Sequence, residues 1–356
     1  MQNDLFENFI SEHCDLAESL WERAEGRDFS YRIGEIAFTL RIMVRNLANL
    51  HCPAIEHALC SKNENDEWTI YAVDASESDF PLPPEEWILP TNNTDHQRRL
   101  HGSPTDDFVL NADELNGIWN LLDRRKKRAL YWIRDARNLV EWEAGGPFRL
   151  ILHWISQNHD YQMLHGAAVD FGTAKILLTG VGGSGKSTTT AAAVHEGYKI
   201  AGEDFVIVNK IGDPKAHALY DTLKLTGMAL ELFPDYAAKA VNPDRPTDEK
   251  ARIYLSEVSP GCLISRMPLE AIAVLRLGRK KNTDIRPVSP AIALRALAPS
   301  TLFLLRNGFN EGFRWIADFV RTVPCYEVIL GTDPLEAVGK LSKCEVKSDH
   351  RCYANT

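Results

Sequence analysis

Eight residues, GVGGSGKS at positions 180–187, have the composition and spacing of a phosphate-binding loop. They fit the pattern G-x-x-x-x-G-K-[ST], in which backbone N–H groups of a glycine-rich loop wrap a polyphosphate at the positive end of the next helix. In this pattern the Lys186 ammonium reaches the β- and γ-phosphate oxygens, and the Ser187 hydroxyl holds Mg²⁺. The residues expected to bind the nucleotide are Gly180, Gly182, Gly183, Ser184, Gly185, Lys186, Ser187 and Thr188.

The segments on both sides of this loop are those that the pattern needs. Residues 176–179 are apolar and predict a strand that enters the loop. Residues 187–195 are rich in alanine and contain no glycine or proline, which predicts a helix that leaves it. A glycine-rich turn that binds nothing is the alternative, and the joint occurrence of motif and context disfavours it.

Two adjacent carboxylates, Glu203 and Asp204, follow the predicted helix and one short predicted strand. This connection can return them to the phosphate side of a sheet. Neighbouring side chains of an extended backbone point in different directions, so one carboxylate would face a metal ion and the other an acceptor hydroxyl. Phosphoryl transfer needs charge neutralisation, in-line positioning and a base for the hydroxyl. A polar turn that ends a strand is the alternative.

Other candidates are less sharply marked. Lys250 and Arg252 lie in the charged segment PDRPTDEKARIYL at 243–255, where they could supply a cation to the transferring phosphate or be exposed loop charges. Asn209, Lys210 and Asp213 resemble the guanine-reading pattern N-K-x-D. Their spacing is one residue too long, so ATP is preferred over GTP.

Three blocks together resemble the catalytic domain of HPr kinase/phosphorylase and, more closely, the HPr kinase-like proteins related to it. The blocks are HGAAVD at 165–170, the loop at 180–187 and GYKIAGED at 197–204, within a resemblance over about residues 145–341. It implies a P-loop kinase that uses ATP and Mg²⁺. It also implies that Asp204 accepts the proton of a substrate serine, that Glu203 lies near the metal, and that His165 is the active-site histidine.

Further segments resemble motifs of the HPr kinase-like relatives: ALYDTLKL at 218–225, DEKAR at 248–252, LAPST at 297–301 and VPCY at 323–326. Tyr220 and Lys224 are weaker candidates within them, since strand and surface positions explain both as well. The stretch that the family links to phosphorolysis has no counterpart, and residues 1–145 do not match the N-terminal domain of HPr kinase. Phosphorolysis, HPr as substrate and a hexamer are therefore not implied.

The elements that must position these residues predict two domains. Residues 146–342 alternate strands and helices around the loop, which predicts an α/β fold with a P-loop kinase core of HPr kinase type. Residues 1–145 predict a smaller α+β domain, for which substrate recognition is a hypothesis, and residues 343–356 a polar tail. In the second half, strands are expected at 163–171, 175–179, 198–200, 205–208, 251–255, 272–277 and 325–330, and helices at 148–158, 187–195, 290–297, 310–323 and 334–341.

The first half has a weaker pattern. Apolar periodicity predicts a helix at 3–25, strands within 29–43 followed by a helix to about residue 59, and a strand at 68–73. Five prolines and many turn residues predict an irregular segment at 76–105. Residues 129–134 and 139–143 predict two paired strands.

Composition limits the partners and the compartment. A formal net charge of −9 over 356 residues argues against nucleic acid or an anionic membrane as the main partner. Seven scattered cysteines without a C-x-x-C pair are typical of a reducing compartment. No signal peptide or transmembrane segment is recognised, so a cytoplasmic location is expected. The oligomeric state is not predicted.

Three functions fit these observations. The first is a kinase that transfers phosphate from Mg-ATP to a serine or threonine hydroxyl of a protein or peptide, with Asp204 as base and Lys186, His165 and Arg252 at the reaction centre. The second is a kinase of a small hydroxylated metabolite. The third is a P-loop ATPase or nucleotide-dependent switch, which needs no acceptor base.

Overall fold

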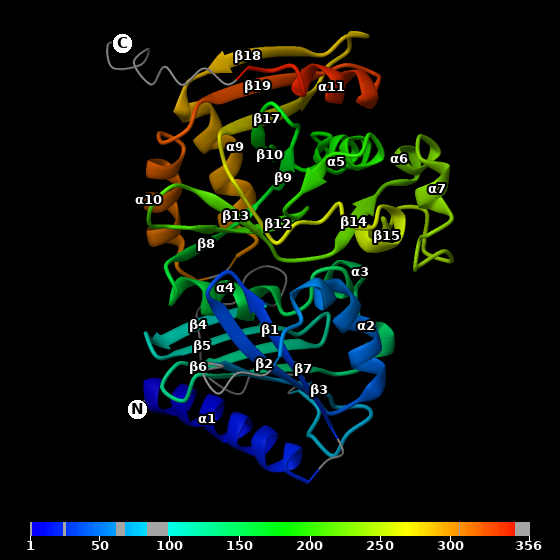
Figure 1. Cartoon of the computed structure of the whole chain (residues 1–356). Helices are drawn as coiled ribbons and strands as arrows, with labels where there is room; N and C mark the ends of the chain where they lie inside the picture. The colour runs from blue at the N-terminus through cyan, green and yellow to red at the C-terminus, as the bar shows by residue number, and fades with distance from the viewer. Residues whose placement is uncertain (1, 24–25, 62–67, 84–98, 306, 346–356) are drawn as a thin grey trace. The chain divides into compact units, whose positions relative to one another are not determined.

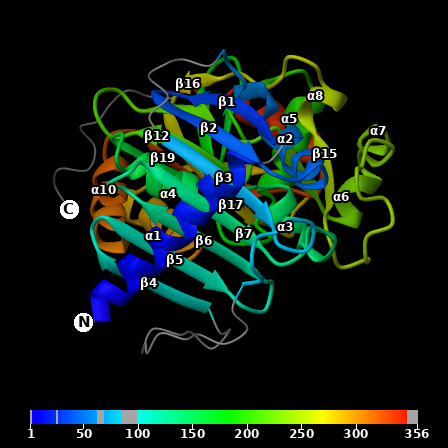
Figure 2. The same cartoon turned by 90° about the horizontal axis from the view of Figure 1, so that it is seen from below.

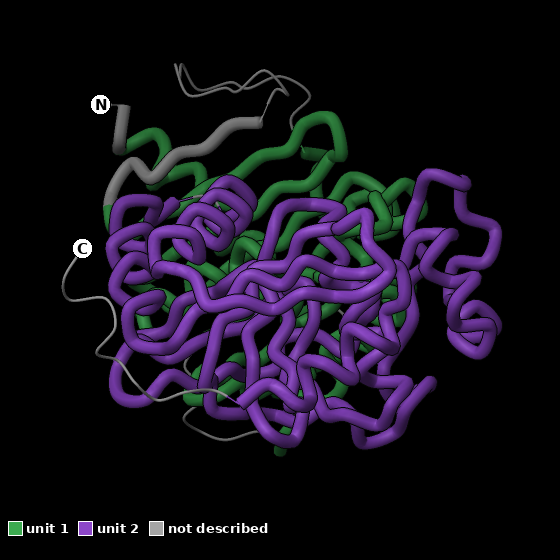
Figure 3. The backbone as a smooth tube through the Cα atoms, turned by 90° about the horizontal axis from the view of Figure 1, so that it is seen from above, with its two compact units in different colours: residues 1–159 green, residues 160–356 purple. Residues whose placement is uncertain are grey.

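The computed structural model describes residues 2–23, 26–61, 68–83, 99–305 and 307–345 (Figure 1). The chain forms two compact units, residues 1–159 and residues 160–356 (Figure 3). Both combine helices with β-sheets, and unit 2 is consistent with the α/β fold expected for the second half. No helix of the described ranges combines the length and the apolarity needed to cross a membrane.

Unit 1 is built on one seven-stranded mixed sheet of order β1-β2-β3-β7-β6-β5-β4. Its strands are β1 Arg27–Ile33, β2 Ile36–Ile42, β3 Trp68–Asp74, β4 Arg99–Thr105, β5 Phe108–Asp113, β6 Ile118–Asp123 and β7 Arg128–Ile133. Its helices are α1 Gln2–Trp21, α2 Arg45–Ile55, α3 Glu141–Ala144 and α4 Arg149–Gln157, with the 3-10 turns η1 Glu56–Ala58 and η2 Ala136–Asn138.

Helices cover both faces of this sheet, which explains why β5, β6 and β7 are buried throughout. Helix α1 lies across the strands on one face (Figure 2) and buries Ile10, Cys14 and Ala17 against a core that includes Trp132 of β7. The next residue back along β7, Tyr131, points to the other face, because side chains alternate along a strand. Its ring packs edge-on against Phe148, which immediately precedes α4.

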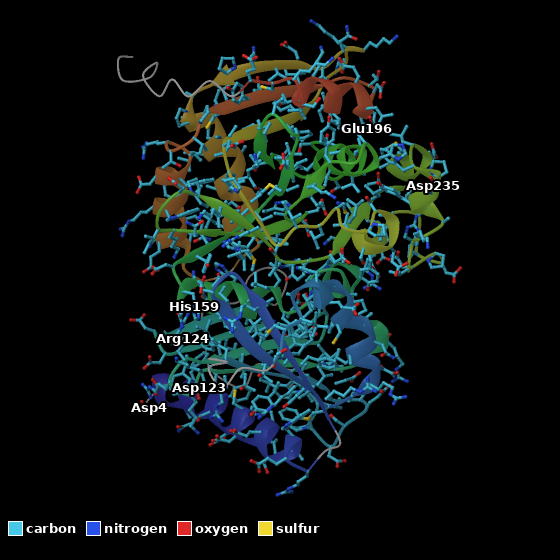
Figure 4. The ribbon with its side chains drawn as sticks, in the orientation of Figure 1. Asp4, Asp123, Arg124, His159, Glu196 and Asp235 are labelled. Carbon is cyan, nitrogen blue, oxygen red and sulfur yellow. The ribbon has the colours of Figure 1, made fainter. Side chains whose placement is uncertain are left out.

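The boundary between the units falls later than the expected end of the first domain at residue 145. Helix α4 packs on β6, and two side-chain hydrogen bonds anchor the segment that follows α4 to unit 1. Arg124 Nε donates to Asn158 at 3.2 Å, and Trp68 Nε1 donates to His159 at 3.1 Å (Figure 4 labels Arg124 and His159). Residues 146–159 therefore belong to unit 1.

Two expectations for unit 1 are wrong. Residues 139–143 do not form a strand: after Asp135 caps the turn η2 by accepting from the Arg137 N–H, the chain continues into helix α3. The pairing partners of β7 are β6 and β3. Within the expected irregular segment 76–105, β4 pairs with β5 as an edge strand, a position that tolerates Pro104. Residues 84–98 lie outside the described residues.

Unit 2 contains a six-stranded sheet of order β11-β9-β10-β17-β19-β18, a four-stranded sheet β16-β13-β12-β8 and the two-stranded ribbon β14-β15. The strands are β8 Tyr161–His165, β9 Ala167–Asp170, β10 Lys175–Thr179, β11 Lys199–Ile200, β12 Phe205–Asn209, β13 Lys215–Ala218, β14 Thr222–Leu225, β15 Ala251–Tyr254, β16 Arg266–Pro268, β17 Ala271–Leu277, β18 Asp284–Val288 and β19 Cys325–Leu330. The helices are α5 Lys186–His195, α6 Gly227–Glu231, α7 Pro234–Ala237, α8 Leu255–Val258, α9 Pro290–Leu302, α10 Phe309–Phe319 and α11 Pro334–Leu341.

Strand alternation divides the core of unit 2 between the two faces of the six-stranded sheet. Ile176 and Leu178 of β10 belong to the apolar cluster that contains residues of α5 and α11. Leu177, between them, belongs to the cluster that contains residues of α9 and α10. Continuous apolar runs are typical of strands covered on both faces. Strand β10 therefore lies inside a sheet that is covered on both faces, and α5 packs on one of these faces.

The expected single strand 163–171 is two strands that belong to different sheets. β8 ends at His165 and pairs with β12, and β9 starts at Ala167 and pairs with β10. The chain changes sheets at Gly166, where a Cβ atom would lie 2.7 Å from the carbonyl oxygen of Leu178. This close approach places His165 at the junction of the two sheets. Of the expected polar tail, residues 346–356 lie outside the described residues.

Candidate functional site

The predicted phosphate-binding loop joins β10 to α5 at the centre of the six-stranded sheet. It emerges at the carboxyl ends of β10 and its parallel neighbour β17, which is the edge where open α/β sheets bind ligands. Lys186 is buried, and its Nζ donates to the carbonyl oxygens of Gly180 at 2.7 Å and Val181 at 3.3 Å. Burial lowers the pKa of Lys186, against the opposing charges of Glu203 and Asp204. The amine thus rests on loop carbonyls beside the position expected for a phosphate.

Gly185 is a loop position with little room for a side chain. Its φ is 97°, and a Cβ atom would lie 2.5 Å from Leu330 Cδ1 on β19. At Gly182 a Cβ atom would have no neighbour within 4 Å. The loop therefore has room for a side chain at position 182 but not at position 185.

Gly185→Ala is expected to lower the free energy of unfolding by about 1–3 kcal/mol, because a side chain there is strained in its backbone as well as in its contacts. Gly182→Ala is the matched control and is expected to unfold like the parent chain. Denaturant titration of both variants measures the difference. Equal stabilities would contradict the tight packing of the loop against β19.

Glu203 lies against the hydroxyl group that is expected to hold Mg²⁺. Ser187 Oγ donates to Glu203 Oε1 at 2.6 Å. The second carboxyl oxygen, Oε2, is buried and has no hydrogen-bond partner among the described residues. Burial and then the charge of Asp204 raise the pKa of Glu203. A buried carboxyl oxygen that lacks a partner, beside a hydroxyl, supplies the hard oxygen donors that Mg²⁺ prefers, so these residues fit the expected ion.

No cluster of three or more His, Cys, Asp or Glu side chains suited to a metal occurs in the described ranges. Mg²⁺ in nucleotide sites takes one or two protein carboxylates and fills its shell with phosphate oxygens and water. The Ser187–Glu203 pair therefore matches the kind of site in which the nucleotide supplies part of the shell.

Asp204 has an unusual backbone. Its φ is 66°, and the N–H of Phe205 donates to the carbonyl oxygen of Glu203 at 2.8 Å, which closes a three-residue turn around it. The expected extended backbone at this pair is therefore wrong, although the two carboxylates do point to different partners. Positive φ in a residue other than glycine is uncommon and costs free energy. The Asp204 carbonyl oxygen accepts from the N–H of Gly166 at 3.0 Å, which ties the turn to the junction between the sheets.

Two basic side chains flank the Asp204 carboxylate. Lys224 Nζ lies 2.6 Å from Oδ2, and His165 Nε2 lies 3.3 Å from Oδ1. Strand register explains the second contact, because His165 pairs with Phe205, the neighbour of Asp204. Burial alone would raise the pKa of Asp204, but the Lys224 charge and the His165 ring outweigh it and hold the pKa well below the ordinary value. Asp204 is therefore ionised at neutral pH.

Hydrogen bonds fix the orientation of the His165 ring. Its Nδ1 lies 3.1 Å from the carbonyl oxygen of Ser300, and its backbone N–H donates to Thr301 Oγ1 at 3.1 Å. A carbonyl oxygen only accepts, so Nδ1 is the donor in this contact. The ring therefore presents Nε2 to the Asp204 carboxylate.

Lys224 is the functional candidate that sequence reasoning undervalued. The sequence explains it equally well as a strand or surface position, yet it is only 8% exposed and its ammonium touches Asp204. On the ribbon β14-β15 it lies directly opposite Arg252. Arg252 is buried as well, so the exposed-loop interpretation is wrong for it, whereas Lys250 is exposed. A lysine in an otherwise apolar buried strand was the available signal.

The remaining candidates have other local environments. Tyr220 is buried in the core. Asn209 Nδ2 donates to the carbonyl oxygens of Ile211 and Asp213, so the segment that resembles the guanine-reading pattern closes the turn between β12 and β13. Thr188 follows Ser187 in the first turn of α5 and is half-buried.

No protein-family model matches the chain, and no curated protein matches it. Among solved structures, the chain is similar to the Hpr(Ser) kinase/phosphatase from Coxiella burnetii, with a TM-score of 0.30 and 9% sequence identity over 51% of this chain and 93% of that one. A likeness of this size does not establish a common fold, so the function is inferred from the site itself.

Proposed function

We propose that unit 2 transfers the terminal phosphoryl group of ATP to a serine or threonine hydroxyl of a protein or peptide. The observation that carries the proposal is the pair of carboxylates beside the loop, each with a separate environment. Glu203 is 2% exposed and bound to Ser187, whereas the Asp204 side chain is 22% exposed. The buried acid suits the metal, and the accessible acid suits an incoming hydroxyl.

In this proposal each residue has one role. The loop N–H groups and Lys186 hold the β- and γ-phosphates. The acceptor oxygen bonds to the γ-phosphorus as the bond from that phosphorus to the β,γ-bridging oxygen breaks, and the bridging oxygen leaves with ADP. The proton of the hydroxyl passes to the Asp204 carboxylate, which His165 positions. Arg252 adds positive charge near the transferring group.

Ser187 and Glu203 are the residues that would hold Mg²⁺. The ion, when bound, would reduce the negative charge of the terminal phosphates. The described side chains supply the rest: Glu203 keeps the Ser187 hydroxyl oriented by a 2.6 Å hydrogen bond, and α5 points its amino end at the phosphates.

Glu203→Gln is expected to raise the Mg²⁺ concentration needed for half-maximal nucleotide turnover by about 10- to 100-fold, the usual cost of losing a group that binds or orients a metal ligand. The amide keeps the shape of the side chain but not its charge. Turnover measured across a Mg²⁺ titration checks this, with Glu196→Gln, on the exposed end of α5, as the control. An unchanged Mg²⁺ requirement would remove Glu203 from the metal site.

The acceptor class is tested by incubating the protein with ATP labelled at the γ-phosphate, Mg²⁺, and the small proteins and peptides encoded beside it. Intact mass spectrometry is expected to find one added phosphate on one of them, absent with Asp204→Asn. Free phosphate with every candidate unmodified would contradict the kinase proposal and favour an ATPase.

One observation favours a nucleotide-hydrolysing switch as a second candidate. Both oxygens of Asp204 are already engaged, by Lys224 and by His165. In that state the carboxylate is a poor proton acceptor. A kinase therefore needs a step that frees the Asp204 carboxylate from these side chains, whereas a switch needs no such step. A metabolite kinase has the same requirement as the protein kinase and is tested by the same assay with small hydroxylated compounds.

A further inference from the structure

We propose that Lys224 exchanges Asp204 for the terminal phosphoryl group when a nucleoside triphosphate occupies the loop, and so frees Asp204 for the acceptor hydroxyl. This inference rests on the proposed function and adds a binding residue and a step to it. The ligand is the third phosphate of a nucleoside triphosphate, so the same residue would distinguish a triphosphate from a diphosphate.

The register of the ribbon brings two cations face to face. Lys224 and Arg252 are directly opposite each other on antiparallel strands, so their side chains share one face. The backbone N–H of Arg252 donates to Asn242 Oδ1, and the backbone carbonyl oxygen of Arg252 accepts from the N–H of Val241. Its backbone groups therefore point away from β14. Pairs of this non-hydrogen-bonded kind have the closer side chains, with Cα atoms about 4.5 Å apart.

Like charges directly opposite each other on a sheet are destabilising unless an anion lies near them. Asp204 supplies one negative charge at 2.6 Å from Lys224. The exposed Lys250 precedes β15, and its charge acts on both Lys186 and Glu203. Several basic side chains beside one accessible carboxylate are the composition expected of a polyphosphate site.

Of the two groups on Asp204, Lys224 is the one able to move. The His165 ring is fixed by the Ser300 carbonyl oxygen, and its backbone is fixed by Thr301 and by pairing with Phe205. Lys224 is held at its ammonium only by Asp204 among the hydrogen bonds of the described residues. A lysine ammonium is a point charge on a flexible four-carbon stem, which can turn without moving the strand.

A terminal phosphoryl group binds the Lys224 ammonium more strongly than the Asp204 carboxylate does, because it carries more negative charge and three acceptor oxygens. When Lys224 turns to it, Oδ2 of Asp204 loses its partner and is open to the acceptor hydroxyl. The site would then expose Asp204 to the acceptor only when a triphosphate is bound. A diphosphate lacks the third phosphate and would leave Lys224 on Asp204.

The test compares the binding of ADP with that of the non-hydrolysable β,γ-imido analogue of ATP, both with Mg²⁺, by titration calorimetry. The parent chain is expected to bind the analogue more tightly than ADP. In Lys224→Met this preference falls by about tenfold or more, the value of one charge-assisted hydrogen bond, with ADP affinity unchanged. Lys224→Arg keeps part of the preference. Lys199→Met, on the exposed end of β11, is the control and keeps all of it.

The possible failures are distinguishable. Unchanged ADP binding also shows that Lys224→Met is folded. If that variant keeps the full preference for the analogue, this inference is overturned while the proposed function stands. If the parent chain binds neither nucleotide, and Lys186→Met changes nothing, the proposed function fails and the inference fails with it.

Discussion

Lys186→Met is expected to reduce phosphoryl transfer by about 10²- to 10³-fold, the usual cost of removing one group that stabilises developing charge. Lys186 is buried at the start of α5, and its ammonium already lies in the loop, on the Gly180 and Val181 carbonyl oxygens. Methionine keeps the length and volume of the side chain, so the fold is expected to persist. Steady-state release of ADP, with ATP and Mg²⁺ in excess, measures the effect.

The matched control for this variant is Lys175→Met. Lys175 begins β10, the strand that leads into the same loop, and its ammonium pairs with Glu270 at 3.7 Å on the surface. Its loss is expected to leave the rate unchanged. Transfer by Lys186→Met at the parent rate would eliminate phosphoryl transfer by this loop, whereas an equal loss in both variants would indicate a general structural effect.

The parts of the site that lie close in sequence were predicted well. The strand, loop and helix around residues 175–195 occur with nearly the expected bounds, because a glycine-rich motif between an apolar run and an alanine-rich run constrains local structure strongly. The proximity of Glu203 to Ser187 also agrees with the expected return of the chain. The short stretch of chain between Ser187 and Glu203 limits how far apart these two residues can lie.

The parts that depend on distant pairing could not be predicted in the same way. The register of β14 with β15 decides that Lys224 is beside Arg252, and the crossing at Gly166 decides that His165 meets Asp204. The residues that pair are far apart in the chain, and a single-residue slip would turn each side chain to the other face. The positive φ of Asp204 likewise accompanies a tertiary hydrogen bond, from the N–H of Gly166 to its carbonyl oxygen, that the sequence does not reveal.

Asp204→Asn is expected to lower turnover by about 10²- to 10⁴-fold while nucleotide binding persists, because a proton acceptor is needed only in the reaction. Asparagine is the informative substitution at this position. Asp204 has a φ of 66°, which asparagine tolerates better than alanine. Alanine would change the backbone and the chemistry together. Turnover within a few-fold of the parent would remove Asp204 from the reaction.

The charge change also affects stability. Asparagine leaves the Lys224 ammonium without its counter-ion, which costs up to about 3 kcal/mol for a largely buried pair. The folded-state pKa of Asp204 is held below its unfolded value, chiefly by Lys224 against the opposing effect of burial. Its contribution is therefore present above the unfolded pKa and is lost as pH falls through the lower, folded-state value. The difference in free energy of unfolding between the parent and Asp204→Asn should therefore become smaller as the pH falls.

The double variant Asp204→Asn with Lys224→Met separates the two effects. Removing the ammonium takes away the uncompensated buried charge that the single variant creates, so much of the lost stability should return. The proton acceptor is still absent, so turnover should stay low. Recovery of both stability and turnover would mean that Asp204 serves only to neutralise Lys224. Recovery of stability alone would mean that the carboxylate is needed for the reaction itself and that its pairing with Lys224 is the resting arrangement from which catalysis begins.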